Sequence, residues 1–133
     1  MKGNNMYDVR IINDEVILFK DNVAVLNLES LRDDDYLIRY YLDDSSYVCI
    51  WSNNTIIWYN SNSKIHRDGD MPAYIINTGF MKYYYHGIQH RITGPATISN
   101  HGVRYYINGI HYTKNQFINE LNSNYGTIFQ QSA

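Results

Sequence analysis

Cysteine, long apolar runs and an excess of one charge sign are all missing from this chain, and each absence excludes a class of protein. The 133 residues include one cysteine, Cys49, so a fold held by internal disulfides is excluded. No window approaches the roughly 20 consecutive apolar residues of a membrane-spanning helix. Residues 1–5 lack the apolar run of a secretory signal. We therefore expect a soluble, intracellular protein without a membrane span.

The charge balance argues against a general affinity for polyanions. The 11 lysine and arginine residues and the 13 aspartate and glutamate residues give a formal net charge of −2. No overall positive field therefore attracts nucleic acid or an acidic membrane, although a local basic patch is compatible with this total. Hydrophobic residues make up 44% and charged residues 18% of the chain, as in a folded domain.

Tyrosine is the residue that the chain has in excess. Its 14 tyrosines supply large amphipathic rings, which favour strands, sheet surfaces and binding faces over helix interiors. Cys49 lies in the apolar run 47–51, where we interpret it as a small buried hydrophobe rather than a nucleophile.

Short β-branched apolar runs separated by turn residues fill the first half of the chain. Asn13-Asp14 and Asp21-Asn22 are turn signals between such runs, which predicts successive antiparallel strands. Residues 28–35 change character and predict a loop or a single helical turn. The strands predicted before the middle of the chain span residues 9–12, 16–19, 23–26, 36–42, 47–51 and 55–59.

An internal repeat organises residues 58 to 113. Pro72-Ala73 recurs 23 positions later as Pro95-Ala96, and the aromatic segment 82–87 recurs 22 positions later as 104–109. A fixed period is the signature of stacked structural units. Each aromatic segment ends in a glycine turn, and the Asn-Gly of the second segment is the strongest short hairpin signal. The repeat therefore predicts successive β-hairpins.

Side chains alternate between the two faces of a strand, so each aromatic segment has an inward and an outward set. The set expected to face the core is Met81, Tyr83, Tyr85, Val103, Tyr105 and Ile107. The outward set, our candidate partner-binding residues, is Lys82, Tyr84, Arg104 and Tyr106. Cations interleaved with rings can stack on bases or hold a partner. Cross-strand packing on a solvated sheet surface explains the same pattern.

The chain is expected to form a single domain without a low-complexity linker. Along residues 1–133 we distinguish an irregular β-strand half (1–54), hairpin repeats (55–113), a short helix (114–122) and a polar tail (123–133). Thr113 is placed to cap the helix, in which apolar residues recur at helical spacing. The predicted fold class is all-β, an antiparallel meander of repeated β-hairpins with a short C-terminal helix.

The repeated phrase resembles the variant MORN-type repeat found in proteins of large DNA viruses, bacteriophages and bacteria. Residues 90–96, His-Arg-Ile-Thr-Gly-Pro-Ala, carry the family pattern His-Arg-x-x-Gly-Pro-Ala, and residues 66–73 carry a version interrupted by Asp70-Met71. The resemblance covers roughly residues 56 to 122 and implies hairpins stacked side by side. It also implies interaction roles, including antitoxin-like binding, without a shared catalytic residue. A viral structural or host-interaction protein, in the host cytoplasm or the virion, is the function it suggests.

The corner motif His66-Arg67-Asp68 has two interpretations. It matches letters of a kinase catalytic loop, but the glycine-rich loop and the strand lysine of a kinase are missing. We favour a structural role, in which His66 and His90 hydrogen-bond the backbone at a corner. Arg67 and Arg91 would then cover rings or pair with carboxylates.

Metal and hydrolase sites are the remaining chemical alternatives. The five histidines follow the hairpin period and lack the spacing of metal ligands, so no metal site is predicted. Two acidic loops would make a paired-carboxylate hydrolase site if they converged, and tight turns are the commoner explanation. Their aspartates are Asp33, Asp34, Asp35, Asp43 and Asp44.

We predict a non-enzymatic protein-interaction or structural module with no cofactor, no catalytic residue and no metal. Its outer aromatic face, or an exposed sheet edge, would contact a protein partner, and the open edges also allow a homo-oligomer. The first alternative is a nucleic-acid-associated protein that uses the basic and aromatic face. The second is a small hydrolase that uses the aspartate loops.

Overall fold

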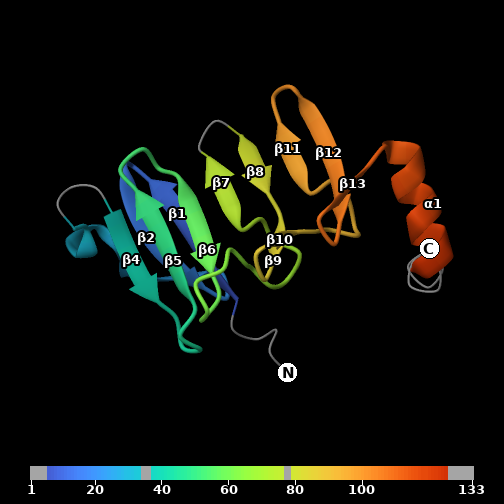
Figure 1. Ribbon diagram of the computed structural model, residues 1–133. Coiled ribbons are helices and arrows are strands. Elements are labelled where there is room, and N and C mark those ends of the chain that lie inside the picture. The colour runs from blue at the N-terminus through green and yellow to red at the C-terminus, as the bar shows by residue number, and fades with distance from the viewer. Residues whose placement is uncertain (1–5, 34–36, 77–78, 126–133) are drawn as a thin grey trace.

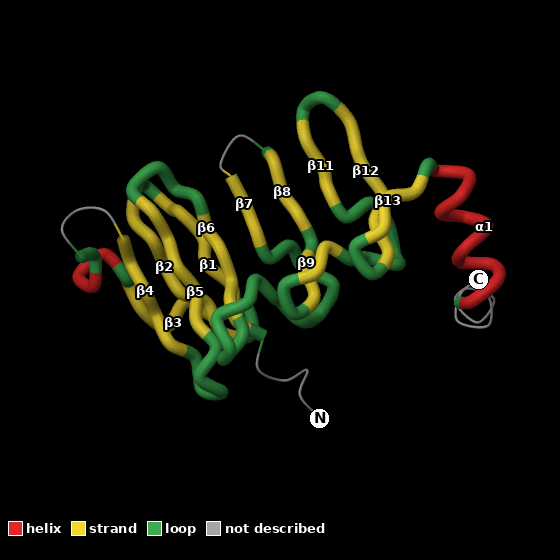
Figure 2. Tube along the Cα trace, in the orientation of Figure 1, coloured by secondary structure: helices red, strands yellow, loops and turns green. Residues whose placement is uncertain are grey.

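The computed structural model describes residues 6–33, 37–76 and 79–125. Over these ranges the chain is antiparallel and all-β with one C-terminal α-helix, as the sequence predicted (Figure 1). The strands form a three-stranded sheet, an eight-stranded sheet and a two-stranded pair. Figure 2 shows the hairpins following one another along the molecule toward the helix.

The N-terminal sheet contains β1 (Tyr7–Ile12), β2 (Glu15–Lys20) and β3 (Val23–Asn27) in that order. Both of its turns, Asn13-Asp14 and Asp21-Asn22, place two residues at φ between 51° and 67°, as a two-residue hairpin turn requires. A 3-10 helix at Glu29–Leu31 follows. The predicted strands are confirmed, and the described part of residues 28–35, predicted as a loop or a single helical turn, contains this 3-10 turn.

The eight-stranded sheet is a meander, because strands that follow one another in sequence are also neighbours in the sheet. Its order is β13-β12-β11-β8-β7-β6-β5-β4. The first four strands of the sheet are β4 (Leu37–Tyr41), β5 (Tyr47–Trp51), β6 (Ile56–Tyr59) and β7 (Tyr74–Ile76). The other four are β8 (Phe80–Lys82), β11 (Thr97–Ser99), β12 (Gly102–Ile107) and β13 (Ile110–Tyr112). The separate pair, β9 (Tyr84–Tyr85) and β10 (Ile88–Gln89), interrupts the meander between β8 and β11.

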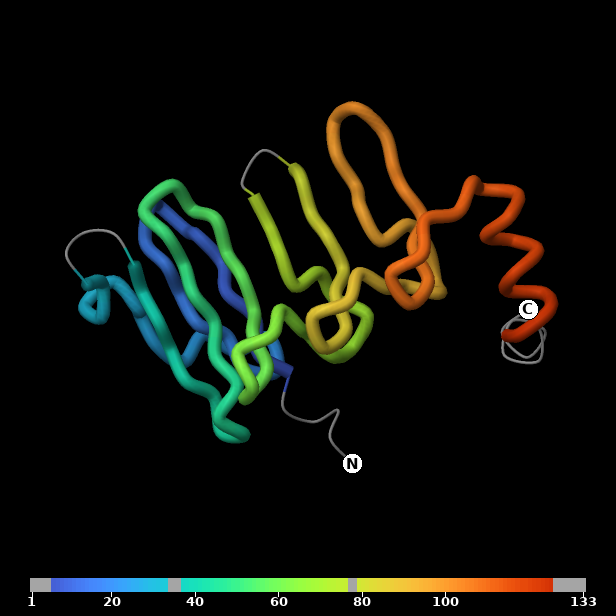
Figure 3. Tube along the Cα trace, viewed as in Figure 1, coloured from blue at the N-terminus to red at the C-terminus, as the bar shows by residue number. Residues whose placement is uncertain are grey.

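The main hydrophobic core lies between the N-terminal sheet and the first strands of the eight-stranded sheet. Figure 1 shows β1 and β2 lying along β5 and β6. The buried residues of this core are Val9, Val16, Leu18, Leu28, Ile38, Val48, Ile50, Ile56, Trp58 and Ala73. A second, smaller cluster joins Ile107 to Phe117 and Leu121 of the helix. The colour gradient in Figure 3 shows the later hairpins following one another in sequence order toward the C-terminal helix.

Helix α1 (Lys114–Asn124) closes the end of the sheet and extends two residues beyond the predicted range 114–122. Thr113 caps it as expected, because its Oγ1 accepts a hydrogen bond from Gln116 N at 3.2 Å. Gln116 Oε1 accepts in return from Thr113 N at 2.9 Å, which completes a capping box. Of the predicted polar tail, residues 126–133 lie outside the described ranges.

The predicted inward-facing set is wrong for part of its members. Tyr83 and Ile107 are buried, at 8% and 3% exposure, but Tyr85 and Val103 are 54% and 51% exposed. The alternation fails at Tyr83 because β8 ends one residue before it and β9 begins one residue after it, so the phase of the strand is lost. Val103 lies in the β11–β12 hairpin, which extends beyond the region that the N-terminal sheet covers (Figure 1).

Candidate functional site

One row of cross-strand partners runs across the eight-stranded sheet. Residues paired between adjacent strands lie on the same face, so the register alone defines the row. From β4 to β12 its members are Arg39, Cys49, Ile57, Tyr74, Lys82, Thr97 and Arg104. The opposite face of β4 to β6 carries the buried residues that pack on the N-terminal sheet. The row therefore lies on the face that this sheet does not cover.

Tyrosine rings flank the row. Tyr47 pairs with both Tyr41 and Tyr59, and its ring centroid lies 5.2 Å and 4.9 Å from theirs. Tyr106 flanks the row in β12, two residues beyond Arg104. Tyr84 lies in the separate β9–β10 pair, half-buried against the main core and close to Tyr74 and Tyr106. Burial is the main cause that raises the pKa of Tyr84, and the nearby hydroxyls of Tyr74 and Tyr106 add to the shift. We call this surface the tyrosine face, defined as Arg39, Tyr41, Tyr47, Tyr59, Tyr74, Lys82, Tyr84, Arg104 and Tyr106.

The four residues singled out from the sequence all belong to the tyrosine face. Lys82 and Arg104 are both cross-strand partners of Thr97, one on each side of it. The Lys82 ammonium lies 5.8 Å from the ring centroid of Tyr74, close enough for a cation–π contact. The ring of Tyr106 lies 5.1 Å from that of its partner His111.

Sequence reasoning missed five members of this face. Arg39, Tyr41 and Tyr47 lie in β4 and β5, before the repeat, and Tyr59 and Tyr74 lie in β6 and β7, outside the repeated aromatic segments. A signal was nevertheless present, since Arg39 and Tyr41 alternate with buried Ile38 in one short strand. Alternation predicts which residues of one strand share a face. Which residues of different strands lie side by side on that face depends on the pairing register, which the sequence does not state.

Charge is segregated on this sheet. None of the strands from β4 to β13 contains Asp or Glu. Their Lys and Arg residues are Arg39, Lys82 and Arg104, and all three lie in the row. Among the described residues these three cations form no ion pair. The tyrosine face is therefore locally basic in a chain whose net charge is −2.

Cys49 lies beneath this face and is not available as a nucleophile. Its side chain is free and only 3% exposed. Burial raises the pKa of the Cys49 thiol, against the opposing effect of the Arg39 guanidinium beside it. A thiol that stays protonated is a poor nucleophile, so the prediction of a small buried hydrophobe is confirmed.

The corner histidines bind the backbone, as the sequence predicted. Nδ1 of His66 accepts a hydrogen bond from His86 N, and Nδ1 of His90 accepts one from Asn108 N, both at 2.9 Å. Because Nδ1 of His66 is an acceptor, its Nε2 carries the proton and donates to Asp68 Oδ1 at 2.9 Å. Burial lowers the pKa of both corner histidines. These contacts hold the turn that follows each aromatic segment.

The corner arginines cover rings, also as predicted. The guanidinium carbon of Arg67 lies 4.1 Å from the ring of Trp58, and that of Arg91 lies 3.8 Å from the ring of Tyr83. Each also donates to the carbonyl of the proline in its own repeat. The repeated phrase therefore encodes a repeated structural corner.

Carboxylates from the preceding unit complete each corner. Arg67 donates to Asp8 Oδ1 at 3.2 Å and to the Tyr7 carbonyl at 3.0 Å, which ties β1 to the first repeat. Arg91 donates to Asp70 Oδ1 at 2.9 Å, which ties the second repeat to the first. Burial by itself would raise the pKa of Asp70. The hydrogen bonds from Arg91 and Thr93 outweigh burial and hold that pKa below its usual value.

The two aspartate loops do not converge, as far as their residues Asp33, Asp43 and Asp44 show. The backbone of Asp33 pairs with Leu37 at the start of β4, whereas Asp43 and Asp44 follow its end. The five residues of β4 separate these positions by about 17 Å. Asp43 accepts from Tyr7 Oη at 2.9 Å, and Asp34 and Asp35 lie outside the described residues. Within those residues, no group of three His, Cys, Asp or Glu side chains could hold a metal ion.

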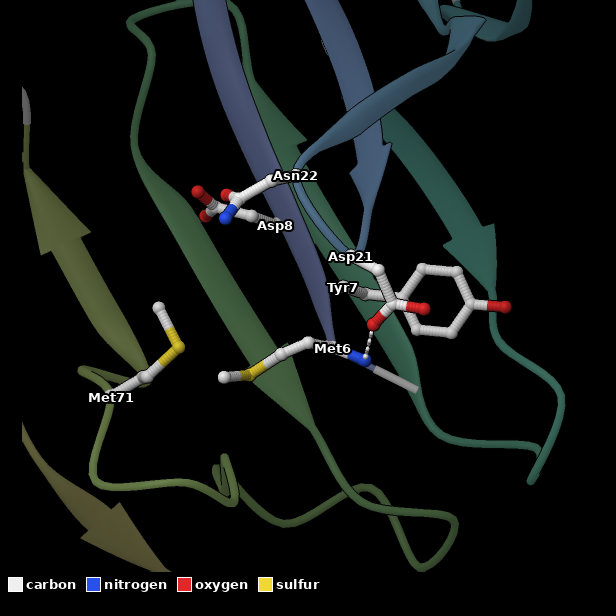
Figure 4. A pocket seen from close by; sticks show the side chains of 6 residues that line it. All are labelled: Met6, Tyr7, Asp8, Asp21, Asn22 and Met71. Carbon is white, nitrogen blue, oxygen red and sulfur yellow. Dashed lines mark hydrogen bonds between the residues drawn. The ribbon is translucent and has the colours of Figure 1, made fainter. Parts of the chain in front are cut away.

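A pocket of about 300 Å³ opens where the N-terminal sheet meets the first repeat. Its lining residues are Met6, Tyr7, Asp8, Asp21, Asn22 and Met71 (Figure 4). Both carboxylates are already engaged, since Asp21 accepts from Met6 N at 3.1 Å and Asp8 pairs with Arg67. We interpret the pocket as a gap at the junction between the N-terminal sheet and the first repeat, not as a ligand site.

Two further observations concern membrane spans and similarity to known proteins. Over the described ranges, no helix combines the length and the apolar character that a bilayer span requires. The chain matches no protein-family model, and comparisons with curated proteins and with solved structures likewise found no match.

Proposed function

We propose that the chain is a non-enzymatic interaction module that binds a protein partner through its tyrosine face. The observation that carries this proposal is the broad row of cations and rings on the side of the sheet that the N-terminal sheet leaves uncovered. Tyrosine and arginine are enriched in protein interfaces because they supply large contact area together with hydrogen-bond donors. Tyr41, for example, is 59% exposed.

The resemblance to variant MORN-type repeats supports the same proposal, since interaction roles are suggested for such arrays. Each corner fixes the next hairpin through histidine and arginine contacts, so the face is a preorganised surface rather than a set of loops. A viral structural or host-interaction protein is the specific role that the resemblance favours.

Site-directed photo-crosslinking tests the proposal. A benzoylphenylalanine at the position of Tyr41, on the face, is compared with one at Ile12, which is 45% exposed on the N-terminal sheet. In an extract of the cells in which the protein acts, we expect a discrete protein adduct from the Tyr41 position and none from the Ile12 position. Equal adducts from both positions, or adducts from Ile12 alone, would contradict it.

A further inference from the structure

We propose that the partner presents an acidic, extended segment that crosses the strands of the tyrosine face. This inference rests on the proposed function and adds the chemical class of the partner. Its basis is the charge segregation described above. The strands from β4 to β13 contain three cations and no carboxylate, although carboxylates outnumber Lys and Arg in the whole chain.

The cations are available to a partner. Among the described residues, Lys82 and Arg104 form no ion pair, and Arg104 is exposed. The corner arginines differ in this respect, because Arg67 and Arg91 are engaged by Asp8 and Asp70. Charges on a sheet surface that the fold does not neutralise favour a partner of the opposite sign and raise its association rate.

The spacing of the cations fits an extended peptide. Lys82 and Arg104 flank Thr97, so they lie two strand spacings apart, about 10 Å. A polyproline II segment has three residues per turn and places every third side chain on one side at intervals of about 9 Å. Acidic residues at every third position would therefore reach Lys82 and Arg104 in turn. Arg39 lies four spacings beyond Lys82, about 19 Å, which is two further steps of the same repeat.

The rings favour a peptide over single-stranded nucleic acid. Bases bind such surfaces by stacking on free ring faces. Tyr47 is stacked on Tyr59 with an interplanar angle of 15°, and it also contacts Tyr41, so its ring faces are already occupied. The Tyr47 hydroxyl is engaged as well, because it donates to Ser63 Oγ at 2.8 Å. This cluster therefore offers a ligand ring edges, whose partial positive charge suits carboxylates and peptide carbonyls.

Fluorescence anisotropy with the full chain tests this inference. The probes are a labelled Glu-Pro-Pro repeat peptide, the matching Lys-Pro-Pro peptide and an oligothymidylate of similar length. We expect the acidic peptide alone to bind, with an affinity that falls as salt rises. Each exposed ion pair contributes roughly a factor of two, so K82Q/R104Q should weaken binding about fourfold. The control K64Q/K114Q removes two exposed cations that lie outside the strands and the row, and it should change binding less than twofold.

Each other outcome overturns the inference. Equal effects of the two double variants would mean that only total charge matters, and tighter binding of oligothymidylate would support the nucleic-acid alternative. Circular dichroism of each variant confirms that the sheet is intact. If the acidic peptide does not bind while crosslinking at the Tyr41 position still captures a protein, the proposed function stands and the acidic partner is wrong. If both experiments fail, the proposed function fails as well.

Discussion

The corner arginines should differ in their contribution to stability, although the sequence repeats them. The side chain of Arg67 is 6% exposed and that of Arg91 is 18% exposed. Arg67 joins the N-terminal sheet to the first repeat through Asp8 and the Tyr7 carbonyl, whereas Arg91 joins two neighbouring hairpins. Replacing Arg67 therefore opens the junction beside the main core.

The magnitude follows from the contacts. A desolvated cation–π contact contributes about 2 kcal/mol, and a hydrogen bond to a charged group about 1.5–3 kcal/mol, with incomplete additivity. Asp8 is 33% exposed, so water screens part of its attraction to Arg67. We expect Arg67→Ala to lower the free energy of unfolding by about 3 kcal/mol and Arg91→Ala by about 1.5 kcal/mol.

Equilibrium urea unfolding followed by tryptophan fluorescence measures this difference, since the ring of Trp58 lies against Arg67. Arg67→Lys is the matched control. It keeps the charge but loses the planar fork, so it should recover only part of the loss. The reasoning is refuted if Arg91→Ala lowers the free energy of unfolding as much as Arg67→Ala does, because the two corners would then contribute equally to stability.

Three further predictions concern the helix cap, a turn and the corner histidines. Thr113→Ala removes the capping box of α1 and should cost about 1 kcal/mol, read from the shift of the urea midpoint. Gly109 has φ +81° and a Cβ there would lie 3.2 Å from Ile88 Cγ2, so Gly109→Ala should destabilise by about 1 kcal/mol or more, and Gly109→Asn by less. Burial lowers the pKa of His66 and His90, so the folded state disfavours their charged forms. Stability is then full above the unfolded histidine pKa of about 6.5 and is lost as pH falls through the lowered folded values. Urea midpoints at pH 7 and pH 5 should differ less in His66→Gln than in the natural chain, and an unchanged difference would contradict this assignment.

The strand pattern was predictable because local signals and tertiary structure agree. The pairs Asn13-Asp14 and Asp21-Asn22 adopt the positive φ that hairpin turns require, and the strands on either side follow from them. The corner contacts of His66 and Arg67 were also predictable, since a phrase that recurs with a fixed period must make the same contacts twice.

The predictions that failed concern features that depend on long-range geometry. Tyr83 and Tyr85 were assigned to one face by strict alternation, but the break between β8 and β9 exposes Tyr85. Arg39 and Lys82 lie in one cross-strand row because of the pairing register of the strands between them. No local sequence pattern specifies that register. The same limit explains why five members of the tyrosine face, among them Arg39 and Tyr74, were not predicted.

Amide chemical-shift mapping during titration with the acidic peptide, or with the captured partner, tests the central claim most directly. The tyrosine face is the claimed contact surface, so the largest shifts should fall on β4 to β8, β11 and β12, at residues such as Arg39, Lys82 and Arg104. The amides of β1 to β3 and α1 should change little. Shifts confined to the N-terminal sheet or to the helix would contradict the account.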